Sequence, residues 1–254
     1  VWPDGLVGVS AGAAFGCNYK SRQVGRAIRY NMRFANDGRY SGVWSLLKSG
    51  NYFNAEFAYH IVPKTYDPFD DIAFEENPME FHVVCTDVVT GKAVYKKLEK
   101  ATEQTYDWIR ASASMPLVSQ YVELEGYKLL DGGVADSIPL AYSEQQGFER
   151  NVVVLTQPDG YVKRRSRLLP LMQVALRHYP RMVEAFRNRP AMYNEQLAYV
   201  KEAEREGRCL VIRPESEIPI GHVSHNPDQM KLVYVMGRKA GEEKIGEIKR
   251  FYKI

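Results

Sequence analysis

The 254-residue sequence predicts an α/β fold in which helices cover both faces of a mainly parallel central sheet. Strand-like runs alternate with helix-like segments, which is the order typical of β-α-β units. Residues 152–155 form a continuous apolar run, as a strand that is covered on both faces requires. The length suits one domain with a sizeable core. We therefore expect three layers, α/β/α, in a single domain of residues 1–254.

Strands are expected where short apolar runs end at turn residues, namely Gly5–Val9, Glu80–Cys85, Lys92–Tyr95, Lys128–Leu130, Asn151–Leu155 and Cys209–Arg213. Residues 152–155 should form the most buried part of the sheet. Helical patterns predict Ala11–Asn18, Val24–Arg33, Gly42–Leu47, Thr105–Ser112, Leu168–Arg177, Ala191–Glu206 and Pro227–Phe251. Asn226-Pro227 and Asp67-Pro68 are typical helix starts, with a capping side chain before a first-turn proline. Residues 160–190, rich in Arg and interrupted by prolines, are expected to be a mobile connection.

The first turn has the pattern G-x-S-x-G, in Gly8-Val9-Ser10-Ala11-Gly12, between an apolar strand and a helix of small residues. A tight strand-to-helix turn of this kind presents a reactive serine, and glycines on both sides tolerate the crowding. The N–H of Ala11, at the start of the helix, can stabilise an oxyanion. Ser10 is therefore a candidate nucleophile; the alternative is an ordinary glycine-bracketed turn.

A carboxylate follows another apolar strand in Asp131-Gly132-Gly133. In open α/β sheets, the ends of strands are where binding and catalytic groups gather. Asp-Gly-Gly alone is more often a tight turn. Its occurrence together with the serine turn makes Asp131 the candidate partner of Ser10.

With these two motifs the sequence resembles the patatin-like phospholipases, in particular a bacterial branch of predicted esterases. The similarity extends to Cys85-Thr86-Asp87-Val88-Val89-Thr90-Gly91 and to residues 109–116 (IRASASMP). The resemblance implies a serine hydrolase that cleaves carboxylic esters of lipids, as a phospholipase or acyl hydrolase, through an acyl-enzyme intermediate. It implies a Ser-Asp dyad of Ser10 and Asp131 without a catalytic histidine. It also implies a lipid or small ester as the substrate and no cofactor.

The sequence departs from this family at its N-terminus. The family's glycine-rich oxyanion loop lies about thirty residues before the serine, whereas nine residues precede Ser10 here. The chain begins Val1-Trp2-Pro3 without an initiating methionine. We therefore expect an N-terminally incomplete domain that lacks the first strand and the oxyanion loop. Each lost oxyanion donor should lower the rate by roughly 10²–10³-fold.

Two alternatives to the dyad remain open. The order Ser10, Asp131, then His222 or His225 is also that of an α/β-hydrolase triad, although histidines next to an Asn-Pro helix start are more often loop hydrogen-bonders. The other alternative is a patatin-fold lipid-binding protein with weak catalysis, because a fold alone does not confer an activity.

Aromatic residues are frequent between Tyr30 and Phe74. Single aromatic side chains are usually part of the core. A whole segment of them can also form the wall of an acyl-chain pocket, and we expect this segment to shape one.

Cysteine content and charge bear on the cellular compartment and on the partners of the protein. Cys17, Cys85 and Cys209 are too widely spaced for a disulfide framework or a zinc site, so we expect reduced thiols, no metal and a cytoplasmic protein. Residues 163–189 contain eight basic residues and one acidic residue, so contact with an anionic membrane surface is one interpretation and a solvated helix face the other. No nucleic-acid partner is expected, because no recognised module accompanies this charge.

Overall fold

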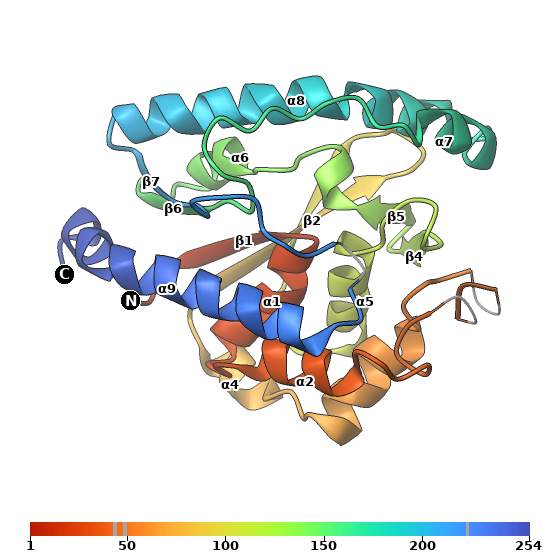
Figure 1. The fold of residues 1–254 in the computed structure, drawn as a ribbon, viewed down its shortest axis with the longest axis horizontal. Helices are drawn as coiled ribbons and strands as arrows, with labels where there is room; N and C mark the ends of the chain where they lie inside the picture. The colour runs from red at the N-terminus through yellow and green to blue at the C-terminus, as the bar shows by residue number, and fades with distance from the viewer. Residues whose placement is uncertain (43–44, 48–49, 222–223) are drawn as a thin grey trace.

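The computed structural model describes residues 1–254 except 43–44, 48–49 and 222–223, and its strands lie between two groups of helices (Figure 1). The strands are β1 (Gly5–Val9), β2 (Glu80–Asp87), β3 (Ala93–Lys97), β4 (Val122–Leu124), β5 (Tyr127–Asp131), β6 (Asn151–Val154) and β7 (Cys209–Ile212). Five of them form one sheet in the order β1-β2-β5-β4 with β3 also paired to β2, and β6 pairs with β7. The predicted α/β class is confirmed.

The helices are α1 (Ala11–Lys20), α2 (Arg26–Phe34), α4 (Asp71–Glu76), α5 (Glu103–Ser112), α6 (Leu140–Gln145), α7 (Leu169–Ala175), α8 (Pro180–Arg205) and α9 (Pro227–Tyr252). Two short elements complete the described structure, the π-helix η1 (Phe57–Tyr66) and the 3-10 helix η2 (Gly132–Val134). Helices α1, α2, α4 and α5 lie on one side of the five-stranded sheet, and α6, α7 and α8 on the other (Figure 1). This gives the expected helix–sheet–helix layering.

The strand pairings are mixed. Parallel pairing holds for β1 with β2 and for β6 with β7, whereas β2–β3, β2–β5 and β4–β5 are antiparallel. The alternation of strand and helix signals in the sequence predicted parallel β-α-β units. Instead β4 and β5 form a hairpin whose turn residues Glu125 and Gly126 have φ of 49° and 85°. Two consecutive positive φ values define the turn that suits the twist of a two-residue hairpin.

The centre of the sheet is β2, whose residues are all buried except the first. The expectation that 152–155 would be the most buried run is wrong, because Val154 is 70% exposed. The physical reason is the pairing: β2 lies between β1, β3 and β5, whereas β6 has only β7 beside it. Apolar runs predict burial only when the strand has neighbours on both edges.

Helix boundaries differ most from the sequence predictions at two places. Helix α8 begins at Pro180 instead of Ala191, so α7 and the start of α8 occupy the segment expected to be mobile. Asp67-Pro68 starts no helix; Asp70 caps α4 instead, accepting a hydrogen bond from the Ala73 amide. The predicted helix 42–47 includes residues 43–44, which lie outside the described residues. The Asn226-Pro227 start of α9 is confirmed, since the Asn226 side chain accepts from the amides of Asp228 and Gln229.

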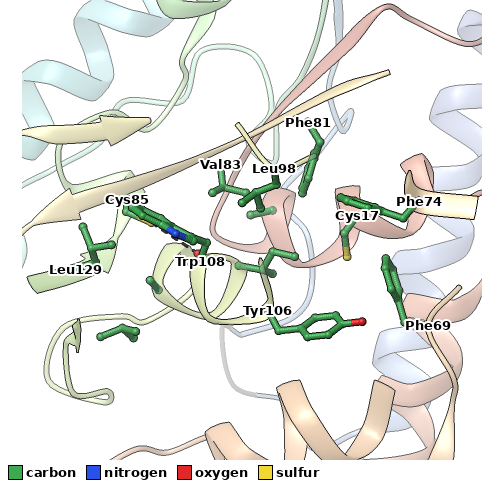
Figure 2. Close-up of a cluster of buried hydrophobic side chains, with 14 residues drawn as sticks. Cys17, Phe69, Phe74, Phe81, Val83, Cys85, Leu98, Tyr106, Trp108 and Leu129 are labelled. Carbon is green, nitrogen blue, oxygen red and sulfur yellow. Dashed lines mark hydrogen bonds between the residues drawn. The ribbon is translucent and has the colours of Figure 1, made fainter. Parts of the chain in front are cut away.

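The main hydrophobic core packs α1, α4 and α5 against β2 and β5 (Figure 2). Trp108 of α5 and Phe81, Val83 and Cys85 of β2 are all almost fully buried in it. Burying a large aromatic side chain contributes roughly 2–3 kcal/mol, so α5 is held firmly against the sheet.

Most of the aromatic residues in 30–74 belong to the protein interior. Phe34, Tyr40 and Phe57 form a buried cluster of their own, and Phe69 and Phe74 belong to the main core. Trp44 lies outside the described residues. Close packing is thus the role of those residues that the structure places in these clusters.

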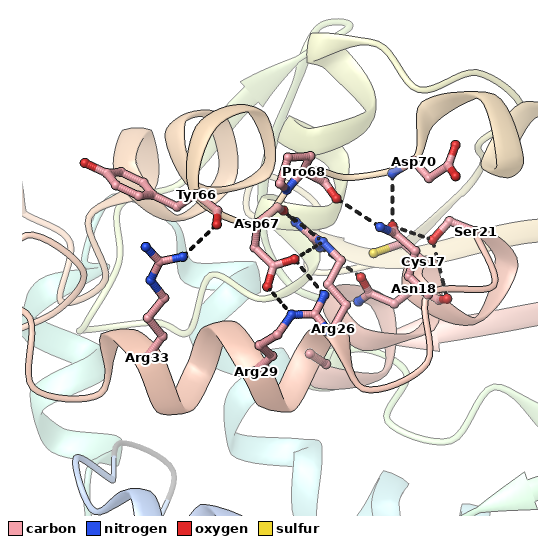
Figure 3. A network of polar contacts seen from close by, with 12 residues as sticks. Cys17, Asn18, Ser21, Arg26, Arg29, Arg33, Tyr66, Asp67, Pro68 and Asp70 are labelled. Carbon is pink, nitrogen blue, oxygen red and sulfur yellow. Dashed lines mark hydrogen bonds and ion pairs between the residues drawn. The ribbon is translucent and has the colours of Figure 1, made fainter.

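A buried ion pair joins α2 to the end of η1 (Figure 3). The Asp67 carboxylate accepts two hydrogen bonds of 2.8 Å from Arg29, and the Asp67 carbonyl accepts from the Arg26 guanidinium at 2.6 Å. Arg26 also donates to the Asn18 side chain of α1 at 2.8 Å. A buried charge is tolerated only when it is paired in this way, and the network fixes α1, α2 and η1 relative to one another.

All three cysteines are free and buried. Burial raises the pKa of Cys17 to about 12 and that of Cys209 to about 11. Burial, and then the nearby charge of Asp131, also raise the pKa of Cys85 far above its usual range. These thiols therefore stay protonated at neutral pH.

Candidate active site

Ser10 lies in a strained turn between β1 and α1. Its φ of 54° and ψ of −117° lie outside the regions that residues with a side chain normally adopt, at a cost of about 1–3 kcal/mol. The Ser10 carbonyl accepts hydrogen bonds from the amides of Ala13 and Ala14, which begin the helix. The amides of Ala11 and Gly12 belong to the first turn of α1, where a backbone N–H has no carbonyl partner within the helix. They are therefore available as hydrogen-bond donors at the start of α1.

The two glycines of the turn have different roles. A Cβ on Gly8 would lie 2.7 Å from the backbone of Ala13, so only glycine fits where β1 passes α1. A Cβ on Gly12 would have no atom within 4 Å. The expectation that both flanking glycines are required by crowding is therefore wrong for Gly12, because this residue lies on the exposed side of α1.

Asp131 ends β5 and is buried. Its carboxylate oxygen Oδ1 accepts a 2.7 Å hydrogen bond from the Gly133 amide, which orients the side chain. Gly132 is required by contact, since a Cβ there would lie 2.1 Å from the carbonyl oxygen of Val84. The Thr86 hydroxyl, also fully buried, donates to the Asp131 carbonyl at 2.8 Å. The backbone of the Asp131 loop is thus held against β2 by these contacts.

Ser10 and Asp131 lie next to the same part of β2. Val9 pairs with Val84 and Asp131 with Cys85, both along the edge of β2 opposite β3, so β1 and β5 lie end to end there. Because β1 is parallel and β5 antiparallel to β2, the two carboxyl ends meet at the middle of β2. The sequence analysis had expected them at the common edge of a parallel sheet. The ends of β1 and β5 thus face neighbouring residues of β2, and one residue along a strand is a step of ~3.3 Å.

The end of α5 contacts both candidate residues. The Ser10 amide donates to the Ser112 hydroxyl at 3.0 Å, and this hydroxyl donates to the Val84 carbonyl at 2.6 Å. Two residues further on, the Ser114 carbonyl accepts from the Asp131 amide at 2.8 Å. One short segment, packed on the core by Trp108, therefore fixes the backbone of the serine turn and of the aspartate strand.

A second support for the aspartate loop comes from α8. Arg189 Nε donates a 2.6 Å hydrogen bond to the Gly133 carbonyl, which also accepts from the Ser137 hydroxyl at 2.6 Å. A Cβ on Gly133 would lie 3.0 Å from Asp131 Oδ1 and 3.4 Å from Arg189 Nη2. Gly133 thus leaves room for the guanidinium and the carboxylate to approach each other.

Two groups on other elements lie within electrostatic range of the site, Tyr59 near Asp131 and Lys163 near Arg189. Burial raises the pKa of Tyr59, on η1, to about 12; Arg110 opposes this shift, and Asp131 contributes to it. Lys163 lies near Arg189, and burial followed by the charge of Arg189 lowers its pKa to about 8. Element η1 therefore brings a phenol into electrostatic range of Asp131, and the segment before α7 brings an amine into range of Arg189.

The alternative histidine residues are placed differently. His222 lies outside the described residues. Both ring nitrogens of His225 already have partners, the Tyr52 hydroxyl at 2.6 Å and the carbonyl oxygen of Ala35. His225 therefore acts as a link between α9's start and the segment after α2, in the loop role that the sequence analysis weighed against a triad.

Neither a metal-ion site nor a membrane span is found among the described residues. In these residues, no three side chains of His, Cys, Asp or Glu gather in a way that could hold a metal ion. Across the same described ranges, no helix is both long enough and apolar enough to cross a bilayer.

The fold and site are those of an α/β protein with a serine held at a strand-to-helix turn. A model of the patatin-like phospholipase family matches residues 2–142, which include Ser10 and Asp131, and the chain belongs to this family. A domain of unknown function (DUF6363) matches residues 179–253, which cover α8, β7 and α9. The uncharacterized protein YjjU of Escherichia coli (strain K12) is 29% identical over 171 residues, or 61% of this chain. This chain spans 44% of the length of that relative.

Sequence reasoning missed three residues that support the site: Ser112, Arg189 and Tyr59. Ser112 lies in the quoted segment 109–116, so its motif was found without its role. Arg189 lies in a basic run where single arginines look alike, and Tyr59 lies in a π-helix. A π-helix has no simple sequence period by which it could be recognised.

Proposed function

We propose that this chain hydrolyses carboxylic esters of lipids, with Ser10 as the nucleophile and Asp131 as the base. The observation that carries the proposal is the convergence of the strained Ser10 turn and the end of the Asp131 strand on one edge of β2, at Val84 and Cys85, with α5 hydrogen-bonded to both. The family supplies the substrate class, since patatin-like phospholipases act on lipid esters.

In the proposed reaction, the Ser10 hydroxyl attacks the acyl carbonyl while its proton passes to the Asp131 carboxylate. The tetrahedral oxyanion accepts a hydrogen bond from the Ala11 amide at the start of α1. The bond to the leaving alcohol then breaks, and Asp131 returns the proton to that alcohol. Water cleaves the acyl-enzyme by the same steps and regenerates Ser10. The proposal needs no metal and no cofactor.

The proposal predicts the effect of two substitutions. Ser10→Ala and Asp131→Asn should each lower the turnover of a short, soluble p-nitrophenyl ester by at least about 10³-fold, because each removes a group that acts directly in the reaction. Labelling by a serine-reactive fluorophosphonate should disappear in Ser10→Ala. Circular dichroism and thermal melting would check that both variants remain folded.

Matched controls are Ser166→Ala and Asp159→Asn, which change a serine near the start of α7 and a surface aspartate paired with Arg213. Both should keep full turnover. Undiminished hydrolysis in Ser10→Ala would overturn the assignment. Loss of activity in His222→Ala or His225→Ala, with the dyad variants active, would favour the triad instead. A folded wild-type chain that neither labels nor hydrolyses would favour the lipid-binding alternative.

A further inference from the structure

Helix α7 exposes an apolar surface. Leu168, Leu171 and Val174 repeat every three residues and are 53%, 55% and 68% exposed. Val162, on the segment leading to α7, is 64% exposed. Met172, by contrast, is fully buried, so the helix is attached to the protein by its other side. We call the four exposed residues, with the arginines described next, the α7 face.

Six exposed arginines surround these apolar side chains: Arg164, Arg165, Arg167, Arg177, Arg181 and Arg187. Within the described part of the chain, the one ion pair that any of them forms is between Arg181 and Glu184, at 3.1 Å. Three arginines elsewhere on the surface are paired: Arg205 with Glu202, Arg208 with Glu144 and Glu206, and Arg213 with Asp159 and Glu204. The α7 face therefore combines exposed apolar groups with cations that are mostly without an acidic partner on this protein.

This combination has a specific chemical complement. An interfacial helix places apolar side chains at the boundary between lipid headgroups and acyl chains, while basic side chains attract anionic lipids. A nucleic acid would neutralise the arginines but would leave Leu171 and Val174 in water. An exposed apolar patch bordered by polar groups also marks a binding surface in general, and the charge selects among the partners.

The α7 face is joined to the elements that hold Asp131. Leu176 and Tyr179, at the junction of α7 and α8, pack against Val134 of η2 and Leu130 of β5. Arg189, on the same helix α8, contacts the Gly133 carbonyl. In Figure 1, α7 and the start of α8 lie above β4 and β5. A surface held by α7 would therefore lie on the side of the molecule to which the Asp131 loop is attached.

We propose that the α7 face docks on an anionic lipid bilayer, with Leu168, Leu171 and Val174 in the headgroup region and the surrounding arginines on lipid phosphates. This inference deepens the proposed lipid hydrolysis and rests on it for its biological purpose. It describes how the protein would reach an ester that is embedded in a membrane.

The test measures sedimentation of the Ser10→Ala chain with vesicles, so that no lipid is consumed. Phosphatidylcholine vesicles are compared with vesicles containing 30% phosphatidylglycerol, a fraction of roughly one anionic lipid in three. We expect strong binding to the anionic vesicles alone, decreasing with salt. Replacing Arg164, Arg165 and Arg167 by Gln should weaken it roughly 100-fold, because each basic side chain contributes about a factor of five.

Three further variants separate the apolar contribution from net charge. The pair Leu171→Asp and Val174→Asp should abolish binding, whereas Ile72→Asp, on an equally exposed apolar residue of α4, should leave it intact. Replacing Lys231, Arg238 and Lys239 of α9 by Gln removes the same charge from another surface and should change binding less than fivefold, a loss of under about 1 kcal/mol. Hydrolysis of the soluble ester in the Ser10-containing chain should be unchanged in all of these variants.

Three results would overturn the proposal: no preference for anionic vesicles, equal losses in the α7 and α9 charge variants, or full binding by the Asp pair. Light scattering measures whether the α7 face instead binds a second copy of this chain. A wild-type dimer that the Asp pair converts to monomers, without vesicle binding, would make the α7 face a self-association surface instead. A chain that binds vesicles through α7 but fails to hydrolyse esters would leave the docking surface standing and remove only the proposed activity.

Discussion

The backbone at Ser10 is maintained by its neighbours at an energetic cost. A non-glycine residue with positive φ outside the left-handed helical region is destabilised by about 1–3 kcal/mol relative to a relaxed one. The Ser112 hydroxyl accepts from the Ser10 amide, and the start of α1 donates to the Ser10 carbonyl. These contacts hold the serine above the turn, so Ser112 is a positioning residue.

Ser112→Ala should therefore destabilise the turn. The substitution removes the acceptor of the Ser10 amide in a buried site, and an unsatisfied group of this kind costs about 1–3 kcal/mol. We expect the free energy of unfolding to fall by this amount and kcat for the soluble ester to fall roughly tenfold, with the KM little changed. Urea unfolding and steady-state kinetics measure the two effects.

Ser114→Ala is the matched control for this residue. The Ser114 hydroxyl donates only to the Arg110 carbonyl in α5, whereas the bond to Asp131 uses the Ser114 backbone and survives the change. Its kcat should remain within about twofold of the wild type. Equal kinetics for Ser112→Ala and Ser114→Ala would show that the Ser112 hydroxyl does not position the nucleophile.

Among the secondary-structure elements, α8 is the one whose start was predicted least accurately from the sequence. Its proline at residue 190 lies inside the helix, and a proline there removes one hydrogen bond and crowds the preceding turn, at about 3 kcal/mol. Local sequence patterns therefore predict a helix boundary at Pro190. Burial of Met182, Val183 and Tyr193 on both sides of the proline favours a continuous helix, and tertiary packing of this kind cannot be read from local patterns.

Because α8 is continuous, Arg189 reaches the loop that follows Asp131, and removal of the Arg189 side chain should affect turnover. Arg189→Ala removes the Nε contact with the Gly133 carbonyl and should lower kcat roughly tenfold with little change in KM, because loosening the loop misplaces the base. Arg189→Lys should restore part of the rate, since an ammonium group can also donate to the carbonyl. Steady-state kinetics on the soluble ester measure both variants.

Arg187→Ala is the control, two residues away on the same helix and exposed. It should leave kcat unchanged. If Arg187→Ala and Arg189→Ala had the same kcat, the contact between Arg189 and the Gly133 carbonyl would have no part in positioning Asp131. The comparison also tests whether the region that matches DUF6363 supports a site located in the patatin-like region.

The two site motifs were more predictable than the sheet that carries them. Strand-to-helix turns with a G-x-S-x-G pattern and Asp-Gly-Gly loops have local steric causes, which Gly8 and Gly132 retain in the structure. The antiparallel direction of β5 depends on the hairpin at Glu125-Gly126. β4 is three residues long, too short for a periodic signal, and so the hairpin was missed.

For the whole molecule, buried tyrosines predict the response to alkaline pH. Burial raises the pKa of Tyr30 and Tyr40 well above 10, and that of Tyr59 to about 12. In the unfolded chain these phenols lose their protons near pH 10, whereas in the folded protein they keep them. The unfolded state then binds fewer protons, so the free energy of unfolding should fall as the pH rises above about 10.

Urea unfolding at pH 8, 9, 10 and 11, with tyrosinate absorbance followed in parallel, measures this effect. Lys163 works in the opposite sense, because its lowered pKa makes the unfolded chain bind the extra proton between about pH 8 and 10.5. The decline should thus begin only once the tyrosine contribution dominates. Stability that stays constant or increases up to pH 11 would contradict the burial of these phenols.

Composition and length anticipated the class of the whole molecule, because layered α/β packing follows from the alternation of apolar strands and helices. They did not anticipate which basic residues would be paired. That depends on the position of acidic partners brought together by folding, as with Arg208 and Glu144, which are far apart in sequence.

The inaccessibility of the three thiols simplifies covalent chemistry on this protein. Reagents that modify cysteine act on the thiolate, and in this fold that species is scarce at neutral pH. Electrophiles aimed at an alcohol will therefore meet little competition from sulfur, even without a blocking step. Storage in air should likewise leave these three thiols unoxidised, so preparations need no thiol reductant that could attack an ester.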